Sequence, residues 1–189
     1  MKADILKGRL VRLAAVEPKE IAEASVRWNR DTEYQRLAMI EPANQRSVKL
    51  FTEWAQKDQE KDPPGFYYFA IRTLADNHMV GSCGMGGDIY PAGEAFVGIG
   101  IGLREDWNKG YGTDAMRVLL RFAFDELNLR RVSLSVLEIN ARGIRSYEKA
   151  GFVREGKTRG EILREGRRFD DVFMGILRQD WLANTSLAE

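Results

Sequence analysis

Residues 98–127 read GIGIGLREDWNKGYGTDAMRVLLRFAFDEL, and this stretch decides the fold. It begins as an apolar, glycine-rich strand and continues through a polar loop into a glycine-spaced turn at 108–113. The apolar residues that follow recur at the i, i+3, i+4, i+7 spacing of a helix with one buried face. They are Met116, Leu119, Leu120, Ala123, Phe124 and Leu127. A strand, a glycine turn and a helix start present free backbone N–H groups to an anion, so we expect a phosphate-bearing ligand at 108–113.

Three phosphate-binding patterns can be compared with this stretch. The Walker pattern G-x-x-x-x-G-K-[ST] has no match in the chain. Residues 110–115, GYGTDA, match the dinucleotide pattern G-x-G-x-x-A, and Glu138 lies near the end of the next predicted strand. However, the preceding strand is predicted to end near Leu103, which is too far back for the tight first turn of that pattern. The third pattern is the pyrophosphate loop of proteins that bind acyl-coenzyme A.

Two blocks of the sequence resemble motifs of the GNAT superfamily of N-acetyltransferases. Residues 107–115, WNKGYGTDA, resemble motif A, (R/Q)-x-x-G-x-(G/A), with Trp107 at its first position. Tryptophan is familiar there in the branch that acetylates ribosomal-protein N-termini and its relatives. Residues 140–152, NARGIRSYEKAGF, resemble motif B, N-x-x-(A/S)-x-x-x-Y-E-K-x-G-F. The likeness covers 10–182 and is specific from 98 to 152.

The resemblance implies a mixed α/β (α+β) fold. The family has a mostly antiparallel sheet of six to seven strands with a V-shaped split, flanked by about four helices. We expect one acetyltransferase domain over residues 1–189, with its core at 8–182 and a short tail at 183–189.

The strand predicted at Glu94–Leu103 borders the split. Its period of two places Gly98, Gly100 and Gly102 on one face. A bare face of this kind suits either a thin ligand or a neighbouring element. In the family this strand diverges from the next one, and the pantetheine arm of the coenzyme lies in the gap.

Outside this stretch, hydrophobic periodicity and turn residues predict the other elements. Residues 28–38, WNRDTEYQRLA, resemble a segment that borders the acceptor site in the same branch, and a surface helix–turn–helix is the other interpretation. Strands are expected at 8–13, 66–72, 79–88, 131–138, from 152 and at 171–177, helices at 18–28, 47–59 and 141–150, turns at 61–65 and 76–78, a hairpin at 159–169 and a tail at 179–189.

The resemblance also implies the residues that bind the coenzyme. Main-chain groups near the end of the glycine strand would meet the thioester, the glycine turn would hold the phosphates, and two residues of motif B would complete the site. These residues are Ile101, Gly102, Leu103, Asn108, Lys109, Gly110, Tyr111, Gly112, Thr113, Asn140 and Tyr147.

Acetyl transfer to an amine needs a neutral nucleophile and a donor for the departing thiolate. Tyr147 occupies the family position of the general acid, and a phenol pKa of ~10 is close enough to that of an alkyl thiol for useful transfer; packing on the sheet is the other interpretation. Asn140 would bond the pantetheine or cap its helix. Glu94 is the candidate base, with Asp88, Glu33 or a relay through water as alternatives.

Composition excludes several classes of protein. The net charge of +1 gives no indication of nucleic-acid or membrane binding. The longest apolar run, 95–103, is far shorter than the ~20 residues of a membrane helix, and the first ten residues lack the apolar core of a signal peptide. One cysteine and one histidine exclude an internal disulfide and argue against a zinc site, and they fit a reducing cytoplasm.

We therefore expect a cytoplasmic N-acetyltransferase that transfers an acetyl group directly from acetyl-CoA to a primary amine, without a metal. The amine would belong to a protein N-terminus, a polyamine, an amino sugar or an antibiotic, and a homodimer is the expectation for the family. The alternatives are a non-catalytic module that binds coenzyme A, a nucleotide-cofactor oxidoreductase and a ribosome-associated binding protein. The basic segment 154–168 is interpreted as a solvated hairpin.

Overall fold

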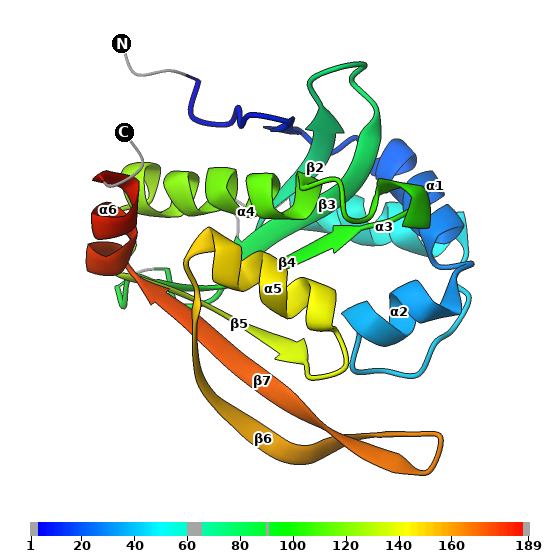
Figure 1. Ribbon diagram of the computed structural model, residues 1–189. Coiled ribbons are helices and arrows are strands. Elements are labelled where there is room, and N and C mark those ends of the chain that lie inside the picture. The colour runs from blue at the N-terminus through cyan, green and yellow to red at the C-terminus, as the bar shows by residue number, and fades with distance from the viewer. Residues whose placement is uncertain (1–3, 60–65, 90, 187–189) are drawn as a thin grey trace.

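The computed structural model describes residues 4–59, 66–89 and 91–186 (Figure 1). Within these ranges seven strands form one sheet in the order β1-β2-β3-β4-β5-β7-β6. Every neighbouring pair is antiparallel except β4 and β5, which are parallel. The strands are β1 Val11–Ala14, β2 Phe66–Thr73, β3 Met79–Gly86, β4 Glu94–Ile101, β5 Arg131–Leu137, β6 Val153–Arg164 and β7 Arg167–Leu177.

Six α-helices are present in the same described ranges, where about four were expected. They are α1 Pro18–Trp28, α2 Thr32–Ala38, α3 Val48–Gln59, α4 Tyr111–Arg121, α5 Ala141–Ala150 and α6 Arg178–Ser186. A 3₁₀ turn, η1 Arg104–Asp106, follows β4, and a π-helical turn, η2 Phe122–Glu126, extends α4. The expected turn at 61–65 lies outside the described residues.

The sheet opens between its two parallel strands, as the V-shaped split predicts. β4 and β5 pair only at Glu94–Arg131, Ala95–Val132 and Phe96–Ser133. Beyond Phe96 both strands continue without pairing to each other, and β4 stays hydrogen-bonded to β3 while β5 stays bonded to β7. The gap between them therefore exposes main-chain groups of both strands to a ligand.

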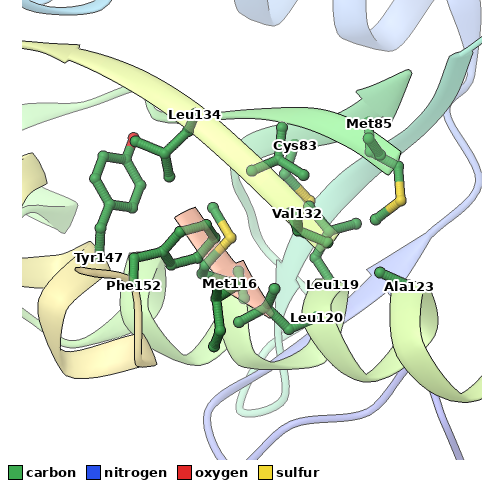
Figure 2. Packing of buried hydrophobic residues seen from close by; sticks show 14 of the residues in the cluster. Cys83, Met85, Met116, Leu119, Leu120, Ala123, Val132, Leu134, Tyr147 and Phe152 are labelled. Atoms are coloured by element: carbon green, nitrogen blue, oxygen red, sulfur yellow. The ribbon is translucent and has the colours of Figure 1, made fainter. Parts of the chain in front are cut away.

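Helices cover both faces of the sheet. α4 and α5 lie on one face, and their apolar side chains form the larger part of the core with the inward side chains of the strands (Figure 2). A smaller cluster joins α1 and α3 to the opposite face near β2 and β3. The labelled core residues are Cys83, Met85, Met116, Leu119, Leu120, Ala123, Val132, Leu134, Tyr147 and Phe152.

The glycine face of β4 accepts a neighbouring element at two of its three positions. A Cβ added to Gly102 would stand 2.2 Å from the Trp28 ring, and one added to Gly100 would stand 2.5 Å from the Tyr34 hydroxyl oxygen. A Cβ at Gly98 would meet no atom within 4 Å. Helix residues therefore cover one part of this face, as the interpretation with a neighbouring element predicts. The part at the split is open, and a ligand there stays a prediction.

Gly102→Ala is expected to lower the free energy of unfolding by about 1–3 kcal/mol, because the Trp28 ring is buried and has no room to move. Gly98→Ala is the matched control, since its methyl group enters open space. Urea unfolding of both variants measures the difference, and an equal loss in the two would contradict the packing argument.

α4 is tied to the N-terminal segment by a buried carboxylate. Asp114 accepts hydrogen bonds from the backbone N–H groups of Arg9, Leu10 and Val11 at 3.2, 2.7 and 3.0 Å. The anchor fixes the start of α4, where the expected phosphate site lies, against β1.

Asp114→Asn is expected to lower the free energy of unfolding by about 1–3 kcal/mol. The new NH₂ group cannot accept a hydrogen bond, so one of these backbone N–H groups would be left unpaired. Glu23→Gln is the control, since Glu23 is exposed and its Lys19 partner is 4.0 Å away. Thermal unfolding compares the two. A loss no larger than that of Glu23→Gln would show that the anchor does not stabilise the fold.

The segment expected as a tail at 179–189 is helical over most of its length. Residues 178–186 form helix α6, and the Trp181 ring packs against Phe124 at a centroid distance of 5.3 Å. The contact joins residues that are distant in the sequence, and the hydrophobic periodicity of residues 178–186 is weak. The sequence therefore did not indicate a helix here. The hairpin expected at 159–169 is confirmed, since β6 pairs with β7 there and the turn residues Glu165 and Gly166 have positive φ values of 51° and 72°.

Candidate active site

A cavity of about 660 Å³ lies at the split. Its walls come from the diverging parts of β4 and β5, the start of α4, one face of α5, and the end of α2 with the segment after it. Elements that are far apart in the sequence thus meet at one opening in the sheet.

The start of α4 supplies the anion-binding geometry predicted for the glycine turn. Gly110 precedes the helix with φ of 86°, a left-handed conformation that glycine adopts without strain. The first helical bond runs from the Asp114 N–H to the Gly110 carbonyl at 3.0 Å, so the N–H groups of Tyr111, Gly112 and Thr113 precede it. These residues line the cavity together with Asn108 and Gly110.

Basic side chains of α5 add charge to this end of the cavity. Arg142, Arg145 and Lys149 all line it. The Arg142 guanidinium lies 3.6 Å from the centre of the Trp107 ring, whose Nε1 donates to the Ile101 carbonyl at 2.8 Å. Trp107 therefore supports a cation at the position where the motif usually has Arg or Gln. The sequence reasoning missed these α5 residues, although basic residues at i, i+3 and i+7 on one helix face were a usable signal.

Tyr147 lies on α5 with 8% of its surface exposed, and it lines the cavity. Its ring packs edge-on against Phe152 with 6.1 Å between the ring centroids. Burial raises the pKa of Tyr147 to about 12. The phenol is therefore protonated at neutral pH and available as a hydrogen-bond donor, but it is a weaker acid than the sequence argument assumed.

Asn140 caps α5. Its Oδ1 accepts the Gly143 N–H at 2.9 Å, and its Nδ2 donates to the Leu37 carbonyl at 3.1 Å. The cap was one of the two expected roles, and the second contact joins α5 to the end of α2. Asn140 also lines the cavity, so a bond to the pantetheine stays a prediction.

The structure does not bring every expected residue to the cavity. Glu94 is the first residue of β4, at the closed end of the split, and it forms an ion pair with Arg130. It is absent from the cavity lining among the described residues, so its position gives no support to a role as base. Glu33 likewise forms an ion pair, in which its Oε2 lies 2.7 Å from Arg104 Nη1.

Three expected coenzyme contacts also lie outside the lining. Gly102 packs against Trp28, Leu103 joins the cluster around α1, and Lys109 Nζ lies 3.5 Å from Asp106 Oδ1. The expected residues that do line the cavity are Ile101, Asn108, Gly110, Tyr111, Gly112, Thr113, Asn140 and Tyr147.

The side of the cavity away from α4 is formed by Tyr34, Leu37 and residues 38–41. Arg164 of β6 holds this segment, since its Nη2 donates to the Met39 carbonyl at 2.6 Å. Residues 28–38 contain the last residue of α1, a turn and helix α2, and α2 borders the cavity.

Ser135 and Asp171 also line the cavity and were not expected there. Asp171 belongs to the segment GRRFDDV at 166–172. Only the strand register shows where its carboxylate lies.

Cys83 lies in the core, where burial raises the pKa of its thiol. It is not part of the cavity lining in the described chain, so the structure gives no support to an acyl-cysteine route. His78 is exposed, with Nε2 3.7 Å from Asp106 Oδ2. The described residues contain no cluster of three or more His, Cys, Asp or Glu side chains suited to a metal ion, and none of their helices combines the length and apolarity of a membrane span.

Comparison with known proteins agrees with this geometry. The acetyltransferase (GNAT) domain family matches residues 11–153. The probable N-acetyltransferase YjcK of Bacillus subtilis is 30% identical over 185 residues, which cover 93% of this chain and 98% of that protein. The putative ribosomal N-acetyltransferase YdaF of the same organism is 35% identical over 78 residues, which cover 41% of this chain and 43% of that protein.

Solved structures share the fold. The spermidine N-acetyltransferase of Vibrio cholerae, solved in complex with CoA and spermine, superimposes with a TM-score of 0.80 at 24% identity, over 91% of this chain and 98% of that one. A GNAT-family acetyltransferase of Bacillus anthracis gives a TM-score of 0.76 at 20% identity, over 92% and 98% of the two chains. The protein belongs to the GNAT acetyltransferase family, and it is an acetyltransferase.

Proposed function

We propose that this protein uses acetyl-CoA to acetylate a primary amine on a small molecule or a peptide, and that residues 1–189 act as one acetyltransferase unit. The observation that carries the proposal is the cavity at the split, which joins a free helix N-terminus to a buried tyrosine. A phosphate-binding end and a proton-donating group in one cavity are what a coenzyme A thioester requires.

The residues present fit a coenzyme A molecule. The N–H groups of 111–113 would bind the pyrophosphate, because they combine open donors with the positive end of a helix dipole. Arg142, Arg145 and Lys149 would contact the remaining phosphate charge. The open face at Gly98 leaves room for the pantetheine arm along β4. When bound, acetyl-CoA supplies an activated acyl group with a thiolate as leaving group.

The chain's own residues would hold the two substrates in register, which can supply much of the rate increase. A backbone N–H near Ile101 would stabilise charge on the carbonyl oxygen, and Tyr147 would donate to the departing sulfur. We infer direct transfer of the acetyl group from the thioester to the amine, since the described cavity lining includes no cysteine. The proposed route needs no metal.

Thiol release from acetyl-CoA tests the proposal, together with mass spectrometry of the acceptor. The panel contains spermidine, spermine, N-terminal peptides, amino sugars and aminoglycosides. Polyamines are included because acidic residues, Glu41 and Asp171 among them, line the cavity. The proposal is supported if at least one amine becomes acetylated while free thiol is released. Absence of acetylation for every amine of the panel would contradict it.

A thermal shift with coenzyme A separates the remaining alternatives. Stabilisation without turnover would favour a binding module. The dinucleotide interpretation has no support, because β4 ends at Ile101, well before the Gly110 turn. A homodimer, a cytoplasmic location and the absence of nucleic-acid binding stay predictions.

A further inference from the structure

Asp171 is a buried carboxylate at the split. It lies on β7 opposite Leu137 of β5 and Thr158 of β6. Only 3% of its surface is exposed, and it lines the cavity. An acidic side chain this deeply buried needs a partner, because its desolvation is costly.

The strand register places Asp171 on the face of the sheet opposite Tyr147. Val136 and Val172 are paired and belong to the core under α4 and α5, where Tyr147 packs. Successive side chains alternate between faces, so the neighbouring pair, Leu137 and Asp171, points to the other side. The phenol and the carboxylate thus reach one cavity from opposite faces of the sheet.

The other residues on this second face leave the cavity open near Asp171. Phe96 pairs with Ser133, so Gly98 and Ser135, each two residues further on, share their face at the two edges of the split. Gly98 has no atom within 4 Å of its Cβ position. An acceptor that approaches from this side would therefore meet no side chain at Gly98.

Asp171 is not paired with a cation. Its Oδ1 is inaccessible to solvent and makes no hydrogen bond, and no lysine or arginine forms an ion pair with it, in the described part of the chain. Glu161 on β6 is the carboxylate whose charge acts on Asp171. The cavity that Asp171 lines also contains the acidic residues Glu41 and Asp106 and, on α5, the basic residues Arg142, Arg145 and Lys149.

Burial raises the pKa of Asp171, and the Glu161 charge raises it further, while a hydrogen bond from Ser135 lowers it. A carboxylate with a raised pKa is a better proton acceptor than an exposed one.

We propose that Asp171 contacts the acceptor amine, binding it as an ammonium and taking its first proton. The inference rests on the proposed function and adds the acceptor-side catalytic residue. An ammonium group is the partner that this site lacks, because it would supply both the missing positive charge and a hydrogen-bond donor to the carboxylate.

The protons and bonds of this step balance. Asp171 takes one proton from the ammonium, which leaves a neutral amine with a free lone pair. The nitrogen then bonds to the acetyl carbon as the carbon–sulfur bond breaks, and the sulfur keeps that electron pair. The second proton of the nitrogen passes to the thiolate, and Asp171 later releases its proton to solvent. The products are the acetylated amine, the free thiol and one proton.

The test uses the full chain with the best acceptor of the panel. Asp171→Asn is expected to lower kcat/KM for the acceptor by about a hundredfold, because an amide cannot take the proton. Its Kd for coenzyme A should stay within about twofold of wild type, because α4 and α5 are unchanged. Asp170→Asn is the control, since this neighbouring carboxylate bonds Lys157 and the Gly160 N–H outside the cavity.

The pH profile separates a catalytic role from a structural one. Activity should fall as the pH decreases through the pKa of Asp171. Ser135→Ala removes the hydrogen bond that lowers this pKa, so the acid limb of kcat/KM should move to higher pH. Glu161→Gln removes the charge that raises it, so the limb should move to lower pH. These two variants decide the question even if Asp171→Asn does not fold.

The inference and the proposed function fail in different ways. Two results with an active wild type would overturn the inference alone. One is an acid limb that neither Ser135→Ala nor Glu161→Gln shifts, and the other is an Asp171→Asn variant whose kcat/KM stays within about threefold of wild type. A wild type that acetylates no amine would overturn the proposed function, and the inference would fall with it.

Discussion

Tyr147→Phe is expected to lower kcat for acetyl transfer by about a hundredfold, with little change in the Kd for coenzyme A. The variant keeps the buried ring and its packing against Phe152, and it loses only the hydroxyl group. That hydroxyl would act where charge develops on the departing sulfur, so its loss should appear in kcat and not in binding. Single-turnover thiol release measures the effect directly.

The raised pKa defines what Tyr147 contributes. With a pKa of about 12, the phenol lies roughly three to four pKa units above a thiol, so complete proton transfer would be uphill by about 5 kcal/mol. We therefore expect a hydrogen bond to the thiolate, with the proton itself supplied by the amine. Because Tyr147 is protonated throughout the neutral range, its loss should not remove an alkaline limb from the pH profile.

Tyr67→Phe is the matched control for this prediction. Tyr67 is a partly buried tyrosine that packs edge-on against Phe122 at 5.5 Å, and it does not line the cavity. Its variant should keep wild-type kcat. If the two variants behave alike, Tyr147 acts through packing, which was the other interpretation of its place on α5.

The parts of the structure that depend on local sequence could be predicted. The glycine strand, the turn at Gly110 and the helix after it are encoded in one stretch, because period two, a left-handed glycine and period 3.6 follow in order. The Asn140 cap and the Gly151 C-cap of α5 are likewise local, and both are observed. The coenzyme end of the cavity was therefore accessible to sequence reasoning.

The acceptor end could not be predicted, because it depends on contacts between distant segments. Glu94 and Asp171 are both acidic residues on strands, and only the register shows that one lies at the closed end of the split and the other at the cavity. Arg164 similarly looked like part of a solvated hairpin, yet it is buried and binds the segment after α2. Helix α6 depends on the packing of Trp181 in the same way.

Gly112→Asp is expected to raise the KM and Kd for acetyl-CoA by about a hundredfold. Gly112 is the second residue of α4 and lines the cavity where the phosphates would bind. A Cβ there would lie 3.5 Å from Ile101 and 3.6 Å from Ser146, which is ordinary contact, so a side chain fits. A carboxylate about 5 Å from a phosphate charge costs roughly 3 kcal/mol at an effective dielectric constant of about 20.

The same substitution should leave the fold intact or stabilise it slightly, because a carboxylate near a helix N-terminus interacts favourably with the dipole. A substitution that stabilises the fold slightly but weakens coenzyme binding distinguishes an anion site from a purely structural turn. Gly112→Ala is the control, since it adds the Cβ without the charge, and its Kd should rise by less than about tenfold. The gap between the two variants should narrow as the salt concentration rises, because ions screen the repulsion. Isothermal titration calorimetry with coenzyme A at two ionic strengths measures the difference in Kd between the two variants. Equal affinities for Gly112→Asp and Gly112→Ala would mean that the phosphates bind elsewhere.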